Sequence, residues 1–333
     1  MSSCNTSNKI WRQHSDKLKT FICSKVNGDD ACHDMGSTNI IRKFQLTLLF
    51  VSIVFFGFSQ SIHPLEPAGK YYKTYGAINA SPAAARAWMD TITFPWSEYS
   101  QNAITNSLVR TVYLKPEDEA KLPGLIHPPA NSSDQTRAEL DYLLSLQNAR
   151  TKEQIDRAQY IANIGSWFNI LNPTDPDYME NRKQLFYIAE NAGDWYNPRN
   201  FPATTQLLLN CIQDIRVTEF RLKWVFKRPR PYHLEPKLQP LTRIKSPSFA
   251  SGHTLWAFTE AYIFSEIIPE KREEFLKRAD EVRWSRELLG IHYPSDNEAS
   301  RIVGWYLVKY WYNNPIFQKD LEKAKNEWKS RKM

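Results

Sequence analysis

Apolar residues recur at the spacing of α-helices nearly throughout the chain from about Ser81 onward. In residues 138–150, four leucines fall on one side of a helix and the charged side chains on the other. The same spacing predicts further helices at 155–161, 204–226, 253–268, 273–291 and 299–312. The chain has only 11 glycines, and it lacks turn dipeptides at hairpin spacing, which argues against a β-sandwich or barrel. The sequence therefore predicts an all-α fold.

Proline clusters separate these helical segments. They lie at residues 123–129, 173–176 and 229–240, and we expect loops there. Neither a repeat nor a low-complexity linker divides the region after residue 60. We therefore expect one all-α domain over residues 61–333, with a less regular lead-in to about residue 131.

The apolar run at residues 46–59 has the length of a signal-peptide core and is short for a membrane span. Arg42 and Lys43 precede it, and small or polar residues follow it. If translation starts at Met35, residues 35–60 form a signal peptide and residues 1–34 an upstream extension. The alternative is an uncleaved anchor at 46–59. Either way, we expect the rest of the chain to be exported, to the periplasm or the medium.

Composition excludes several classes of protein. A mean hydropathy of −0.54 and a single apolar run exclude a polytopic membrane protein. The net charge of +7 is small for 333 residues and partly lies in the first 60, so no nucleic-acid partner is expected. After processing, only Cys211 would remain, and one cysteine forms no internal disulfide. Cys23, Cys32 and His33 match no zinc spacing, and we expect no metal there.

The segment KWVFKRPRP places two cations at the end of the long helix at 204–226. Lys223 and Arg230 are seven residues apart, so on a continuous helix they share a face. Pro229 and Pro231 indicate that the helix has ended or kinked by then, which still allows both cations to meet one anion. The alternative is a basic helix end that complements the helix dipole.

The segment SPSFASGHTLWAF predicts the beginning of another helix. Ser251 is a candidate N-cap, and Gly252 allows the backbone to approach a ligand closely. Free N–H groups at a helix N-terminus bind anions, and His253 lies in that first turn. The alternative is a capped helix with a solvated histidine.

The segment WSRELLGIHYPSDNEASR adds a second histidine and a carboxylate. Arg286 and His292 flank a helix end, and Asp296 follows the histidine by four residues. Ser295 and Glu298 have the spacing of a capping box, so the next helix is expected to begin beside Asp296. A carboxylate beside an imidazole fixes its tautomer and raises its basicity. The alternative is a surface ion pair at a turn.

Together the three segments supply what phosphoryl transfer requires. Cations neutralise the non-bridging oxygens, one histidine attacks, and the other protonates the leaving oxygen. The patterns K-x6-R-P, S-G-H and S-R-x5-H-x3-D resemble the three-part signature of one superfamily. It joins type-2 phosphatidic acid phosphatases, bacterial class A acid phosphatases and vanadium haloperoxidases. The signature runs from Lys223 to Asp296, and the helical pattern fits this family from about Ala138 to Tyr312.

The resemblance implies roles for the matching residues. His292 would be the nucleophile, Asp296 would orient it, and His253 would be the general acid. The phosphate oxygens would be bound by Lys223, Arg230, Ser251, Gly252 and Arg286. The family usually has a proline before the serine of S-G-H, whereas this chain has Ala250, which is expected to loosen the loop.

Among the branches of the superfamily, an exported helical chain most resembles a bacterial class A acid phosphatase. We expect it to hydrolyse small-molecule phosphate monoesters without a metal or other cofactor, and vanadate to inhibit it. The alternatives are a vanadate-dependent haloperoxidase, for which vanadate is the cofactor, and a lipid or pyrophosphate phosphatase. A phosphate-binding protein without activity and a metal-dependent hydrolase also stay open. The paired histidines disfavour the first, and too few metal ligands disfavour the second. The sequence does not reveal an oligomeric state.

Overall fold

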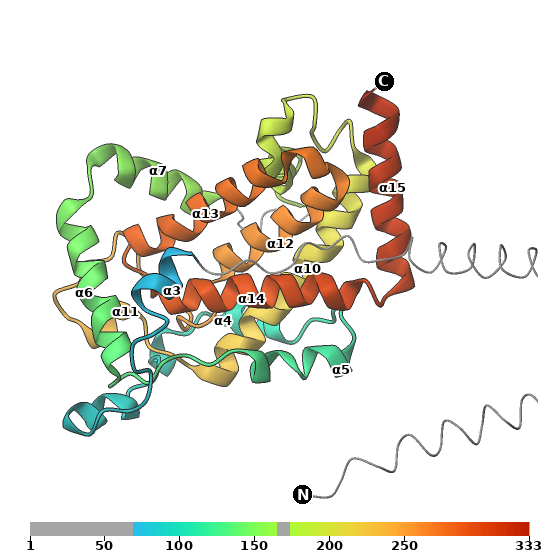
Figure 1. Cartoon of the computed structure of the whole chain (residues 1–333). Helices are drawn as coiled ribbons and strands as arrows, with labels where there is room; N and C mark the ends of the chain where they lie inside the picture. Colours follow the sequence, from blue (N-terminus) through green and yellow to red (C-terminus); the bar gives the residue numbers. More distant parts are fainter. Residues whose placement is uncertain (1–68, 165–173, 333) are drawn as a thin grey trace, which may run out of the picture. The chain divides into compact units, whose positions relative to one another are not determined.

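The computed structural model describes residues 69–164 and 174–332, and every regular element in these two ranges is helical (Figure 1). The predicted leader and anchor segments before residue 61 lie outside the described residues. The α-helices are α3 (Lys70–Thr74), α4 (Gln101–Ser107), α5 (Pro116–Glu119), α6 (Asp134–Ala149), α7 (Lys152–Asn163), α9 (Tyr178–Asn181), α10 (Pro202–Phe226), α11 (Pro231–Leu234), α12 (Gly252–Ile267), α13 (Arg272–Leu288), α14 (Pro294–Trp311) and α15 (Pro315–Lys332). The 3₁₀ helices are η1 (Ala84–Thr91), η2 (Trp96–Glu98), η3 (Leu122–Leu125), η4 (Arg182–Ala192) and η5 (Pro269–Lys271).

The all-α prediction is confirmed, and the segments with helical spacing form α6, α7, α10, α12, α13 and α14. Proline stands in the first turn of several of these helices, where its missing N–H leaves no hydrogen bond unmade. None of the helices in the described residues is long and apolar enough to cross a bilayer.

Helix α12 lies at the centre of the core. It packs against α13, α14, α10 and α15, and nearly every one of its side chains is buried (Figure 1). A helix that is apolar on all sides belongs in the interior, and the FASGHTLWAF sequence supplies that pattern. Because α12 is held on several sides, its N-terminus at Ser251 has a fixed position, and the ends of α10 and α13 come to lie near it. Helices α6 and α7 pack against α13.

Large aromatic side chains fill much of the core. Trp256 and Trp311 are fully buried, and Tyr196 meets Phe201 edge-to-face at 4.4 Å between ring centroids. Other aromatic residues reach the surface, among them Trp88. Cys211 is also buried, and burial raises the pKa of its thiol well above the ordinary value. This thiol is therefore held neutral in the interior.

Two local predictions were wrong. The proline clusters are not simply loops, because Pro123 lies inside η3 and Pro231 begins α11. Proline fits the first turn of a helix, so a proline cluster can mark a helix start. Ser295 and Glu298 form no capping box. Helix α14 begins at Pro294, and the Asp296 carboxylate accepts a hydrogen bond from the Tyr293 N–H at 3.0 Å.

Glu260 lies fully buried in the middle of α12, with the Trp256 indole as its polar neighbour. Burial raises the pKa of Glu260 well above its ordinary value, so the folded protein holds this carboxyl neutral. The unfolded chain ionises it above about pH 4.3. Stability linked to this proton is therefore fully present below that pH and is lost as pH rises towards the folded pKa.

We therefore expect Glu260→Gln to stabilise the protein at neutral pH. Glutamine is uncharged at every pH. We therefore expect the free energy of unfolding to rise by about 2–3 kcal/mol near pH 7 and to be unchanged near pH 4. Urea unfolding of the unmodified protein and of Glu260→Gln between pH 4 and pH 7 measures this difference in the free energy of unfolding. A difference that does not change with pH would contradict the buried neutral carboxyl.

Candidate active site

The three sequence segments meet around the N-terminus of α12. Lys223 lies in the last turn of α10 and Arg230 immediately before α11, because the helix ends at Phe226 and Lys227 adopts a left-handed conformation. Arg286 lies in the last turn of α13, and His292 lies in the loop between α13 and α14. The cluster is well shielded from solvent, since Lys223, Arg230, Arg286 and His292 are each 5% exposed or less.

Both ring nitrogens of His292 lie within hydrogen-bond distance of another side chain. Its Nδ1 lies 3.1 Å from Oδ2 of Asp296, and its Nε2 lies 2.8 Å from Nη1 of Arg230. A guanidinium only donates, so Nε2 must accept, and Nδ1 therefore carries the proton that faces the carboxylate. Burial and then the Arg230 charge lower the pKa of His292 well below its ordinary value. The imidazole thus keeps a lone pair at Nε2 even in acid.

Asp296 is itself anchored by residues that sequence reasoning did not select. Arg228 donates from Nη1 to Oδ1 of Asp296 at 2.6 Å, and the Ser248 hydroxyl donates to Oδ2. Burial opposes ionisation of Asp296, but the Arg228 charge and the hydrogen bonds with His292 and Ser248 outweigh it. The pKa of Asp296 consequently lies below its usual range. The carboxylate stays charged wherever the protein is folded.

Arg228 also connects Asp296 with helix α6. Its Nη1 donates to the Ser295 hydroxyl at 2.8 Å, and its Nη2 lies 3.6 Å from the Glu139 carboxylate. Glu139 in turn accepts from the N–H and hydroxyl of Ser295 at 3.0 and 2.7 Å. All three side chains are buried. No motif marks Glu139, and we expected the charged side chains of its helix to lie opposite the leucines, whereas Glu139 is fully buried.

The two cations of the first segment are held by carbonyl groups. Nζ of Lys223 donates to the Pro247 carbonyl at 2.6 Å, and Nε of Arg230 donates to the Ser246 carbonyl at 2.8 Å. Burial and then the Arg230 charge lower the pKa of Lys223 to about 7. Carbonyl oxygens do not neutralise these cations, and the Glu219 carboxylate, whose Oε1 lies 3.8 Å from Nζ of Lys223, offsets only part of their charge.

His253 and Arg286 share a contact with helix α7. Nε2 of His253 lies 3.2 Å from the Ala162 carbonyl, and Nη2 of Arg286 lies 3.5 Å from the Ala158 carbonyl. Burial and then the Arg286 charge lower the pKa of His253 to about 3. Burial also lowers the pKa of Arg286 to about 9. In this environment His253 is therefore neutral at mildly acid and neutral pH.

Ser251 occupies the N-cap position of α12, as predicted, but its hydroxyl does not cap the helix. It donates instead to Oγ1 of Thr254 at 3.0 Å, and Thr254 donates to Oδ1 of Asn297 at 2.8 Å. The serine carbonyl accepts from the Ser300 hydroxyl at 2.8 Å. These bonds fix the turn that precedes Gly252. Ala250 is fully buried in this turn.

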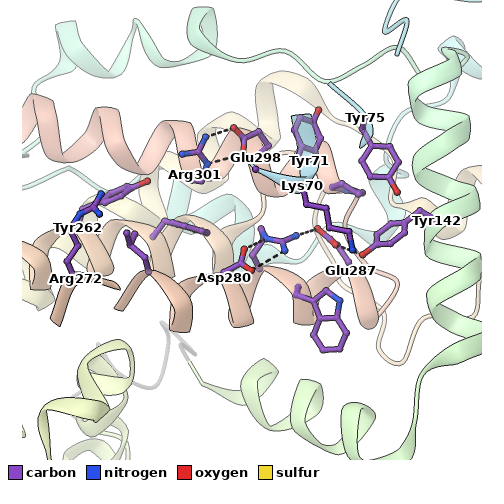
Figure 2. Close-up of a pocket in the computed structure, with 16 residues that line it drawn as sticks. Lys70, Tyr71, Tyr75, Tyr142, Tyr262, Arg272, Asp280, Glu287, Glu298 and Arg301 are labelled. Carbon is purple, nitrogen blue, oxygen red and sulfur yellow. Dashed lines mark hydrogen bonds and ion pairs between the residues drawn. The ribbon is translucent and has the colours of Figure 1, made fainter. Parts of the chain in front are cut away.

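A cavity of about 380 Å³ lies elsewhere, between α3, α6, α12, α13 and α14, and none of the eight predicted site residues lines it. Tyr71, Tyr75 and Tyr142 gather at one end, and Tyr262 and Arg272 lie at the other (Figure 2). Its charged side chains are largely paired with one another. Arg301 bonds Glu298, and Arg283 bonds Asp280 and Glu287 (Figure 2).

Within the described residues, His, Cys, Asp and Glu side chains form no group of three that could hold a metal ion. The cluster contains groups of the kinds that bind anions. Three cations, a helix N-terminus and an unprotonated imidazole nitrogen lie close together in a place shielded from water.

Comparison with known proteins finds a family match over the segment that contains the predicted site residues. Residues 203–318 match the model of the PAP2 superfamily. A non-specific acid phosphatase of Providencia stuartii is 36% identical over 147 residues, which cover 42% of this chain and 59% of the relative. A non-specific acid phosphatase of Salmonella typhimurium is 31% identical over 157 residues, covering 45% of this chain and 61% of the relative. The chain thus spans about three fifths of the length of these relatives.

Among solved structures, a transmembrane PAP2-type phosphatidylglycerolphosphate phosphatase from Bacillus subtilis matches with a TM-score of 0.40 and 20% identity. The match covers 59% of this chain and 90% of that one. The three motifs, their convergence on one buried cluster and the match over residues 203–318 agree. The similarity to the PAP2 superfamily thus lies in residues 203–318, which contain all eight predicted site residues.

Proposed function

We propose that the chain is an exported acid phosphatase that hydrolyses phosphate monoesters through a phosphohistidine intermediate. The observation that carries the proposal is the setting of His292, with the Asp296 carboxylate at Nδ1 and a cation at Nε2. A binding protein needs cations but no oriented, unprotonated imidazole. The acid phosphatases among the relatives support the same activity.

In the first step, Nε2 of His292 attacks phosphorus. The N–P bond forms as the P–O bond to the alcohol breaks, and His253 gives its proton to the departing oxygen. Water then attacks the phosphohistidine and returns a proton to His253. The N–P bond breaks, inorganic phosphate leaves, and both histidines regain their starting states. Lys223, Arg230 and Arg286 balance the charge on the non-bridging oxygens in both steps.

The charges around the two histidines favour catalysis at acid pH. His292 keeps its lone pair in acid because burial and Arg230 hold its pKa low. Without a phosphate beside it, His253 would be neutral, since burial and the Arg286 charge lower its pKa to about 3. A bound phosphate beside Arg286 offsets that charge and raises the proton affinity of His253. His253 therefore takes up its proton when substrate binds, and low pH assists this step.

Hydrolysis of p-nitrophenyl phosphate by the purified protein tests the proposal. We expect turnover at acid pH that persists with a chelator and is blocked by vanadate, which mimics the phosphoryl transition state. Absence of turnover, with halide oxidation by peroxide once vanadate is added, would instead indicate a haloperoxidase. Inactivity in both assays would contradict an enzyme and leave a phosphate-binding protein.

A further inference from the structure

A carboxylate lies against the groups that are proposed to bind phosphate. Glu219 precedes Lys223 by one turn of α10, and its Oε1 lies 3.8 Å from the lysine Nζ. The side chain is only 9% exposed. Its charge also acts on Arg230, since it favours the protonated form of both cations. Glu219 therefore belongs to the anion site and not to the outer surface of α10.

The position of Gly252 shows how close this carboxylate comes to the N-terminus of α12. A Cβ atom added at Gly252 would lie 2.2 Å from both Cδ and Oε1 of Glu219 and 2.3 Å from Oε2. The carboxylate thus occupies the space where any other residue would place its side chain. A negative charge is favourable at a helix N-terminus, and the Glu219 carboxylate supplies one at the N-terminus of α12.

A phosphate bound to the same groups would meet this carboxylate. The other ionisable groups around the site are Lys223 on α10, Arg230 before α11, His253 on α12, Arg286 on α13, His292 in the loop after α13, and Asp296 in the first turn of α14. Asp296 is already neutralised by Arg228. Two like charges that share a buried site cannot both stay ionised at low cost, and one of them takes up a proton.

We propose that Glu219 makes the site selective for the singly charged form of a phosphate monoester, because its carboxylate and a phosphoryl oxygen share one proton in the complex. This inference rests on the proposed function only in taking phosphate as the bound group. The second ionisation of a phosphate monoester has a pKa of about 6, and that of inorganic phosphate is somewhat higher. Affinity for phosphate therefore falls as pH rises through this region, and Glu219 steepens the fall.

Calorimetric binding of inorganic phosphate to the full chain tests the inference without requiring turnover. For Glu219→Gln we expect about tenfold tighter binding than the unmodified protein near pH 7.5, where the repulsion is removed. Near pH 5 the two proteins are expected to agree within about twofold, because the phosphate then carries the shared proton. Glu219→Ala provides a second variant should the glutamine protein fail to fold.

The matched control is Glu119→Gln. Glu119 pairs with Arg221, which is two residues from Glu219 and so lies on the opposite side of α10. The control removes one carboxylate charge from the ion pair between Glu119 on α5 and Arg221 on α10. We expect no change in phosphate affinity. A general effect of net charge would change both variants alike and would overturn the inference.

The unmodified protein supplies a further readout. Phosphate titrations near pH 7.5 in buffers of different ionisation enthalpy measure how many protons the protein takes up when phosphate binds. We expect the unmodified protein to take up protons and Glu219→Gln to take up fewer. Equal or weaker binding by this variant near pH 7.5, or no proton uptake by the unmodified protein, contradicts the inference. If the protein binds phosphate in the expected way but hydrolyses no ester, the proposed function fails and this inference stands. No phosphate binding at all overturns both.

Discussion

Replacing His292 with alanine is expected to lower the turnover of p-nitrophenyl phosphate by about a thousandfold or more. The reason is that the phosphoryl group loses the nitrogen that accepts it. In the folded protein that nitrogen is presented by two fixed partners, Asp296 at Nδ1 and Arg230 at Nε2. Alanine leaves Arg228 paired with Asp296, so we expect the variant to fold and still bind phosphate.

Steady-state kinetics and phosphate binding, measured on the same preparation, separate these effects. His127→Ala is the matched control, because His127 is exposed and is not one of the residues that we assign to the site. We expect the control to keep its activity. If His292→Ala retained more than about a tenth of the turnover while His127→Ala was unchanged, the nucleophile would have to be another group.

Replacing His253 with alanine is expected to have an effect that depends on the leaving group. An alkyl phosphate releases a basic alkoxide that needs a proton, and we expect a loss of about 10²–10⁴-fold in kcat. The nitrophenolate leaving group needs little protonation, so we expect a much smaller loss in kcat with p-nitrophenyl phosphate. His253 lies next to Arg286 at the N-terminus of α12, where it would face the departing oxygen of a bound ester.

The measurement is kcat for a series of phosphate monoesters with alcohols of increasing pKa. A steeper dependence in His253→Ala than in the unmodified protein supports the general acid. Equal losses across the series would show that His253 only binds phosphate or positions other groups, and the protonation step would need another donor.

The long helices could be predicted because each buries one continuous side. Helix α12 shows this most clearly, since it is apolar nearly all round and lies in the centre. The short elements were harder. Pro231 begins a helix and does not interrupt one, and the start of α14 depends on the Asp296 carboxylate and not on Ser295. Such choices rest on which hydrogen bond forms locally, and a residue pattern does not determine this.

The groups to which we assign direct chemistry could be selected from the sequence because their types and spacing are demanding. The supporting groups could not, because their roles arise from contacts between distant segments. Arg228 looked like one more cation at the end of a basic helix, yet it is buried and bonds Asp296, 68 residues away. Glu139 and Glu219 likewise have no motif. Each is a buried carboxylate that is explained only by the cations beside it, Lys223 for Glu219 and Arg228 for Glu139.

Trapping of the covalent intermediate tests the central claim most directly. The full-length protein is mixed with a phosphate monoester labelled in its phosphoryl group, and the reaction is stopped in alkali, where phosphohistidine survives. Peptide mass spectrometry then locates the label. We predict a phosphoryl group on His292 that disappears on acidification and is not formed by His292→Ala. Turnover without label at His292, or label on another residue, would contradict a mechanism through this histidine.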